Sequence, residues 1–116
     1  MSDIFENDMI NCTVNAIQEK MGYDIKAMFV GEVTSITDFF VLASSSNTTQ
    51  LGAMVDGVEE AMKDAGYVLK HREGKAAGGW ILLDYSDIVV HLFISEMREF
   101  YDLDNSWRDV QVKSFD

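Results

Sequence analysis

Apolar residues recur along this chain with two different periods, and the changes between them predict an order of helices and strands. Across residues 4–21 the apolar side chains are three or four positions apart, as on one face of an amphipathic helix, and Gly22 provides a stop signal. The same spacing returns over residues 51–65, after N-cap candidates at residues 44–47, and Gly66 ends it. The chain therefore contains two long amphipathic helices.

Five short segments have the apolar runs or the alternation that are typical of strands. They are residues 25–30, 39–43, 67–72, 80–84 and 88–94, with a turn at residues 85–87. A short helix over residues 96–101, capped by Ser95, is expected next, followed by a partly irregular tail.

The resulting order is α-β-β-α-β-β-β-α, which predicts an α/β fold (an α+β mixed sheet) with helices packed against one sheet. The strand–helix–strand unit around residues 47–66 predicts at least one parallel strand pair. We expect residues 1–116 to form a single domain, with its core at about residues 10–110.

Charge narrows the choice of partners. Twenty acidic residues against nine lysines and arginines give a formal net charge of −11. Phosphate backbones repel such a chain, so we expect little direct nucleic-acid binding. The charge fits either solubility alone or attraction to a basic protein surface. One group of residues is basic and consists of Lys63, Lys70, His71, Arg72 and Lys75. We interpret it as a solvated edge of the molecule in preference to an RNA contact.

Cysteine content and hydropathy indicate a cytoplasmic protein. Cys12 is the single cysteine, so an intramolecular disulfide is impossible, and a lone thiol suits a reducing compartment. The N-terminal residues are acidic, unlike a secretory or mitochondrial leader. No apolar run approaches the roughly 20 residues that a membrane-spanning helix needs.

The carboxylates do not have the spacing that metal-dependent nucleotide transfer requires. That chemistry places two carboxylates on one strand face, where they hold Mg²⁺. Asp84 and Asp87 are three positions apart, and Asp102 and Asp104 follow a predicted helix. Ser44–Ser46 precede a helix without the lysine of a phosphate-binding loop. We therefore expect no catalytic residue, no metal and no cofactor, and hence not an enzyme.

Three segments, which extend with their spacing over about residues 10–110, carry a family resemblance. They are SITDFFVLAS (Ser35–Ser44), HREG with GWILLDYSDIVVHLF (His71–Gly74 and Gly79–Phe93), and REFYDL (Arg98–Leu103) followed by Trp107. Together they resemble the ribosomal silencing factor (Iojap-related) family. The chain departs from the family pattern at Ser86, where glycine is common, and in its final segment, Asp104–Trp107.

The resemblance implies a nucleotidyltransferase-like fold without catalytic residues. It implies a translational repressor that binds the large ribosomal subunit through ribosomal protein L-fourteen and blocks joining of the small subunit. It also suggests a homodimer. A large-subunit assembly factor and a nucleotidyltransferase-like nucleotide-binding protein are the alternatives.

The partner-binding residues are expected in the second and third segments. They are Trp80, Leu82, Asp84, Tyr85, Asp87, His91, Arg98, Tyr101 and Trp107.

The residues themselves are compatible with that assignment. Strand alternation places Trp80, Leu82 and Asp84 on one face, and residues 85–87 belong to an exposed turn. Trp80 fits either an interface or the core, and Asp84 either a partner's cation or a backbone amide of the turn. His91, among apolar residues, is expected to be a hydrogen-bonded core or interface residue rather than a metal ligand.

Overall fold

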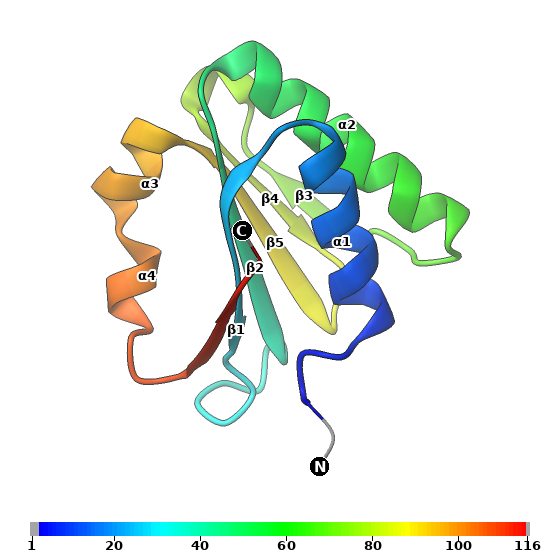
Figure 1. Ribbon diagram of the computed structural model, residues 1–116, viewed down its shortest axis with the longest axis vertical. Coiled ribbons are helices and arrows are strands. Elements are labelled where there is room, and N and C mark those ends of the chain that lie inside the picture. The colour runs from blue at the N-terminus through cyan, green and yellow to red at the C-terminus, as the bar shows by residue number, and fades with distance from the viewer. Residues whose placement is uncertain (1–2, 116) are drawn as a thin grey trace.

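The computed structural model describes residues 3–115, which form one mixed sheet with helices on both of its sides (Figure 1). The described strands are β1 (Tyr23–Phe29), β2 (Phe39–Ser45), β3 (His71–Glu73), β4 (Trp80–Asp84), β5 (Ile88–Ile94) and β6 (Gln111–Ser114). The helices are α1 (Asp8–Glu19), α2 (Thr48–Asp64), the short 3₁₀ helix η1 (Ala76–Gly78), α3 (Ser95–Tyr101) and α4 (Leu103–Ser106). The α/β prediction, with helices packed on one sheet, is confirmed.

The strands are arranged in the order β3-β4-β5-β2-β1-β6. β2 and β5 run parallel, from Phe39 opposite Ile88 to Ser45 opposite Ile94, and the other described pairs are antiparallel. The predicted parallel pair therefore exists. The parallel partner of β2 is β5 and not β3. The strand β3, which directly follows α2, lies at the edge of the sheet.

Side-chain caps fix where the two long helices begin. The Asn7 side chain accepts hydrogen bonds from the backbone amides of Met9 and Ile10, at 2.9 and 3.2 Å, so α1 begins after Asn7 and not at residue 4. Asn47 caps α2 in the same way, by accepting from the Gln50 amide at 2.8 Å. Asparagine thus sets both boundaries.

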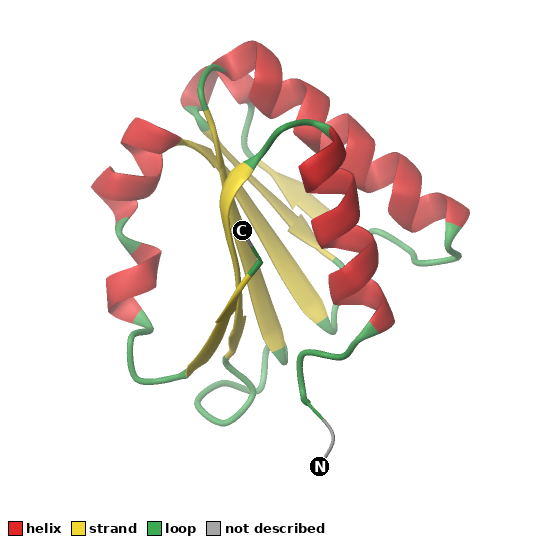
Figure 2. Ribbon diagram, in the orientation of Figure 1, coloured by secondary structure: helices red, strands yellow, loops and turns green. Residues whose placement is uncertain are grey.

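Helices lie on both faces of the sheet (Figure 2), and each face has an apolar layer, one larger than the other. The larger layer lies beneath α1 and α2. It contains fully buried side chains from both helices and from four strands, among them Ile17, Met54, Val41, Leu83 and Val90. The smaller layer contains Met28, Val30, Leu42 and Phe93, which are packed beneath α3, α4 and the residues that follow.

The tail is partly irregular, but residues 111–114 pair with the free edge of β1 as β6. Two other local predictions are wrong. The expected strand over residues 67–72 is confined to the three residues of β3, although the Lys70 amide extends the pairing with a 2.8 Å bond to the Asp84 carbonyl. Ser95 does not cap α3; its hydroxyl oxygen accepts a 2.9 Å hydrogen bond from Tyr23.

Candidate functional site

The face of β3, β4 and β5 that points away from α1 and α2 carries the side chains of Glu73, Trp80, Leu82, Asp84 and His91, and we call it the open face. The strand register places Glu73 opposite Leu82, and Leu82 opposite His91. Trp80, Leu82 and Asp84 are partly exposed, whereas the intervening side chains of β4 are fully buried on the other side of the sheet. The predicted alternation along β4 is therefore confirmed.

Five rings cross the open face and its border in a continuous line, which we call the aromatic row: Tyr101, Trp80, His91, Phe40 and Trp107. The ring centroids of Tyr101 and Trp80 are 4.4 Å apart. The rings of Phe40 contact those of His91 and Trp107 at 4.8 and 5.1 Å, both edge to face. Because the row joins β2, β4 and β5 to residues that follow β5, it fixes the C-terminal segment against the sheet.

A hydrogen bond joins two neighbouring rings of the row, those of Trp80 and His91. The Trp80 indole Nε1–H donates to His91 Nδ1 at 3.2 Å, and the indole also stacks on Phe93, with centroids 5.2 Å apart and planes at 22°. Since an indole can only donate, Nδ1 acts as the acceptor and the proton of a neutral imidazole lies on Nε2. Burial, which leaves His91 5% exposed, lowers its pKa to about 4, so the ring is neutral at physiological pH.

A shallow groove borders Trp80 on the open face. Glu73, Gly74, Trp80 and Leu82 line it, and its volume is about 170 Å³. Gly74 has a φ of +91°, and a Cβ there would come within 2.2 Å of the Trp80 carbonyl oxygen. Glycine at this position therefore permits the tight turn that brings β3 beside β4.

The turn between β4 and β5 separates residues that were expected to lie together. The Asp84 carboxylate accepts a 2.8 Å hydrogen bond from the Ser86 amide, as in a side-chain-stabilised turn. Asp87 is exposed, but Tyr85 is buried in the core beneath α2. The expectation of an exposed Tyr85 is wrong because the alternation of β4 continues through it. Burial, followed by the charge of Glu59, raises the pKa of Tyr85 to about 12.

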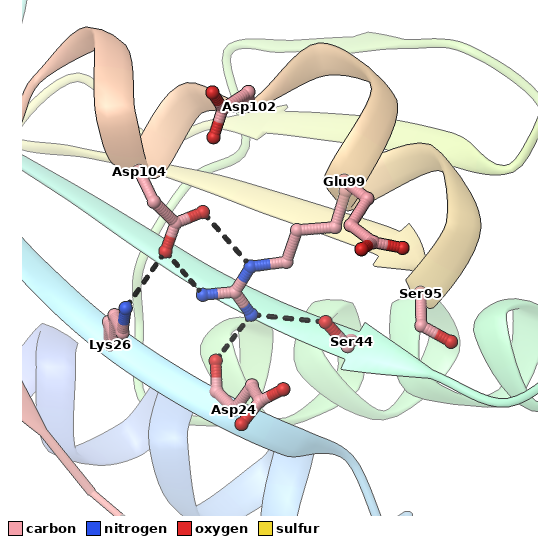
Figure 3. Close-up of a pocket in the computed structure, with 8 residues that line it drawn as sticks. Asp24, Lys26, Ser44, Ser95, Glu99, Asp102 and Asp104 are labelled. Carbon is pink, nitrogen blue, oxygen red and sulfur yellow. Dashed lines mark hydrogen bonds and ion pairs between the residues drawn. The ribbon is translucent and has the colours of Figure 1, made fainter.

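Arg98 is the centre of a polar cluster between α3, α4 and the sheet. Figure 3 labels the residues around its side chain, among them Ser44 and Asp104. Its guanidinium donates to both Asp104 carboxylate oxygens, at 3.2 and 2.9 Å, to Ser44 Oγ at 3.1 Å and to the Asp24 carbonyl. Lys26 Nζ lies 3.0 Å from Asp104. Burial raises the pKa of Asp104, but bonds and charges from Arg98 and Lys26 outweigh it and bring the pKa to about 2.

This cluster, which we call the Arg98 latch, ties the C-terminal segment to β1 and β2. A cavity of about 450 Å³ adjoins it, lined by the latch residues together with Ser95, Glu99 and Asp102. The Arg98 side chain is 10% exposed, so its hydrogen-bonding capacity is directed inward. It orders the segment that carries Tyr101 and Trp107 rather than presenting a cation at the surface.

The structure thus brings Trp80, Leu82, Asp84 and His91 together, with Tyr101 and Trp107 at their border. Tyr85 and Arg98 point into the interior, and Asp87 lies at the turn. Two important residues, Phe40 and Asp104, were not among the expected site residues. The Phe39–Phe40 pair held a signal for Phe40, since successive side chains of a strand point to opposite faces of the sheet. The sequence around Asp104, by contrast, has no pattern that indicates its pairing with Arg98.

Comparisons with known proteins agree with this fold and place the chain in a family. Residues 5–116 match the family described as ribosomal silencing factor during starvation. The chain therefore belongs to that family of ribosome-associated regulators, and the resemblance in its three segments is confirmed.

Individual relatives are similar over most of the chain. The ribosomal silencing factor of Halalkalibacterium halodurans is 28% identical over 102 residues, which cover 88% of this chain and 87% of that protein. A mouse protein named mitochondrial assembly of ribosomal large subunit protein 1 is 33% identical over 97% of this chain and 48% of its own length. A crystal structure of a Chromobacterium violaceum protein, 27% identical, has a TM-score of 0.84 and covers 92% of this chain and 88% of that one.

Two further findings concern only residues 3–115. No helix there is long and apolar enough to cross a bilayer. No three His, Cys, Asp or Glu side chains there are grouped so that they could hold a metal ion.

Proposed function

We propose that this chain represses translation by binding the large ribosomal subunit, through ribosomal protein L-fourteen, and sterically blocking the small subunit. Membership of the silencing factor family is the observation that carries the proposal. Such a role needs an interface rather than catalytic chemistry. We place this role in the cytoplasm, as the bacterial silencing factors among its relatives suggest.

The open face supplies the docking surface in this proposal. It combines a half-buried tryptophan, Trp80, with Leu82, Asp84 and the adjoining groove. Tryptophan and tyrosine dominate many interfaces because they bury large areas with few rotatable bonds. Tyr101, 41% exposed, extends the surface onto α3, where the neighbouring Phe100 is 76% exposed. A standard interface buries about 1,600 Å² in total, and this surface contributes its apolar centre.

Charge supports the choice of a basic partner. The net charge of −11 repels the phosphates that cover much of a ribosome, so specific binding requires a protein patch of opposite sign. Exposed carboxylates such as Asp87 and Glu73 lie near the open face and would accelerate the encounter with that patch. Binding is therefore expected to weaken as salt concentration rises.

The carboxylates that could imitate a transferase site are engaged in structural contacts. Asp84 bonds a turn amide, and Asp104 is held in the latch by Arg98 and Lys26. This arrangement favours the regulatory role over nucleotide transfer. The nucleotidyltransferase-like character of the fold and the homodimer both stay predictions.

A second candidate function is assembly of the large subunit. The printed name of the mouse relative favours it, since that name refers to assembly of the mitochondrial large subunit. Both functions use the same partner, and they differ in whether the particle bound is mature or immature.

Sedimentation with purified, mature large subunits tests the main proposal. The chain should pellet with them, and Leu82→Lys should reduce the bound fraction, because a cation replaces an apolar contact facing a basic partner. Val68→Lys is the matched control, since Val68 is 77% exposed in the connection between α2 and β3, off the open face. Recovery of the chain with immature particles alone would favour assembly instead, and no association with either particle would refute both functions.

A further inference from the structure

We propose that His91 is a positioning residue of the open face, whose Nδ1 acceptor fixes the Trp80 indole in the orientation that the ribosomal partner meets. The inference deepens the proposed function and rests on it for the identity of the partner. His91 itself is too buried to be the main contact, since 5% of it is exposed.

The first support is the geometry around the indole. Phe93 stacks against it and Tyr101 packs on it, with centroids 5.2 and 4.4 Å away, but these contacts are apolar and tolerate rotation of the ring. The 3.2 Å bond from Trp80 Nε1 to His91 Nδ1 is the directional contact that selects one ring orientation. Phe40, edge-on to the imidazole at 4.8 Å, holds His91 in turn.

The second support is that stability alone does not explain an imidazole here. His91 Nε2 is buried and has no hydrogen-bond partner among residues 3–115. A buried donor without an acceptor is destabilising, and an apolar residue of similar size avoids that penalty. An apolar residue, however, would leave the Trp80 N–H without its acceptor. The imidazole is therefore retained as the hydrogen-bond acceptor of the Trp80 indole.

The third support concerns the binding equilibrium. An interface side chain that is already ordered loses less conformational freedom when a partner docks. Loss of the acceptor releases Trp80 to other orientations, and only a fraction of these match the partner. We expect affinity for large subunits to fall about 5- to 10-fold, which lies within the roughly 2- to 12-fold cost of immobilising one large side chain.

Two substitutions separate positioning from packing. His91→Leu has a similar volume and no acceptor, whereas His91→Asn is smaller but places Oδ1 near the position of Nδ1. In the free chain, the Trp80 indole N–H signal in a ¹⁵N-labelled sample reports the hydrogen bond. A Trp107→Phe background leaves one indole signal and makes the assignment unambiguous.

Wild type and His91→Asn should give a protected, slowly exchanging indole proton, and His91→Leu a shifted and rapidly exchanging one. Large-subunit affinity should fall about 5- to 10-fold in His91→Leu and stay within about 2-fold in His91→Asn. The urea midpoint of His91→Leu should stay close to that of the wild type, because the variant removes one unpaired donor, His91 Nε2–H, and leaves another, the half-buried Trp80 Nε1–H. This separation of binding from stability is not expected of a packing residue.

The outcomes that overturn the inference are distinct from those that overturn the proposed function. An unchanged indole signal in His91→Leu, or binding that falls in both variants in step with stability, would reduce His91 to a packing residue. If the wild type does not bind large subunits at all, the proposed function fails. The indole signal of the free chain still decides whether His91 positions Trp80.

Discussion

Acidification from pH 7 to pH 5 should destabilise this protein through one residue, His91. The ordinary pKa of histidine, 6.5, applies to the unfolded chain, whereas burial lowers the pKa in the folded chain to about 4. Between these values the unfolded chain binds a proton that the folded chain excludes. The stabilisation is therefore complete above about pH 6.5 and is lost as the pH falls towards 4.

The size of the effect follows from the two pKa values. At pH 5 the unfolded histidine is almost fully protonated and the folded one about one-tenth protonated, which removes about 2 kcal/mol of unfolding free energy relative to pH 7. Asp104, with a pKa of about 2, stays ionised throughout this interval, so the Arg98 latch does not contribute. For a chain of 116 residues, this is a large fraction of the total stability.

Urea unfolding followed by circular dichroism, at pH 7 and pH 5, measures this difference in the wild type and in His91→Leu. Exposed groups such as His71 are present in both proteins, and their contribution cancels in the comparison. The wild type should lose about 2 kcal/mol more than the variant between the two pH values. Equal losses of unfolding free energy in the two proteins would show that His91 is not held buried and neutral in the folded chain.

Two further predictions concern stability. Asp104→Asn removes the anion that faces buried Arg98 and should lower the unfolding free energy by about 2–3 kcal/mol in urea titrations, whereas exposed Asp102→Asn should change it by less than about 0.5 kcal/mol. Equal effects of the two would show that the latch contributes little. Gly74→Ala should destabilise by at least about 2 kcal/mol, because its φ of +91° strains alanine and the Cβ would collide with a carbonyl of β4. Gly52→Ala, with open space in α2, should instead raise the melting temperature, and a neutral Gly74→Ala would contradict the tight turn.

The local pattern was sufficient for most of the fold. The bounds of β4 and β5 agree with the predicted segments at every residue, because glycine or turn residues flank runs of β-forming side chains. Both long helices were found from their apolar period, and each ended near the predicted glycine. The sequence QVKS of β6, by contrast, has little strand character of its own and becomes a strand because the edge of β1 is available.

The candidate site was less accessible to sequence reasoning, since its parts depend on tertiary contacts. The alternation along β4 predicted that Trp80, Leu82 and Asp84 share a face, and the structure agrees. The sequence around Arg98 did not indicate that its guanidinium would donate hydrogen bonds to Asp104, Ser44 and a carbonyl of β1. These partners come from three different elements, so only the folded chain brings them together.

Subunit joining tests the central claim most directly. Large subunits are incubated with the chain at physiological salt, small subunits are added, and the joined and separate particles are resolved on a sucrose gradient. The proposal predicts that the chain sediments with the large subunit and that the joined particle decreases as the chain is added, with Leu82→Lys much less effective than Val68→Lys. If the two subunits join to the same extent at saturating concentrations of the chain, silencing by a steric block is contradicted.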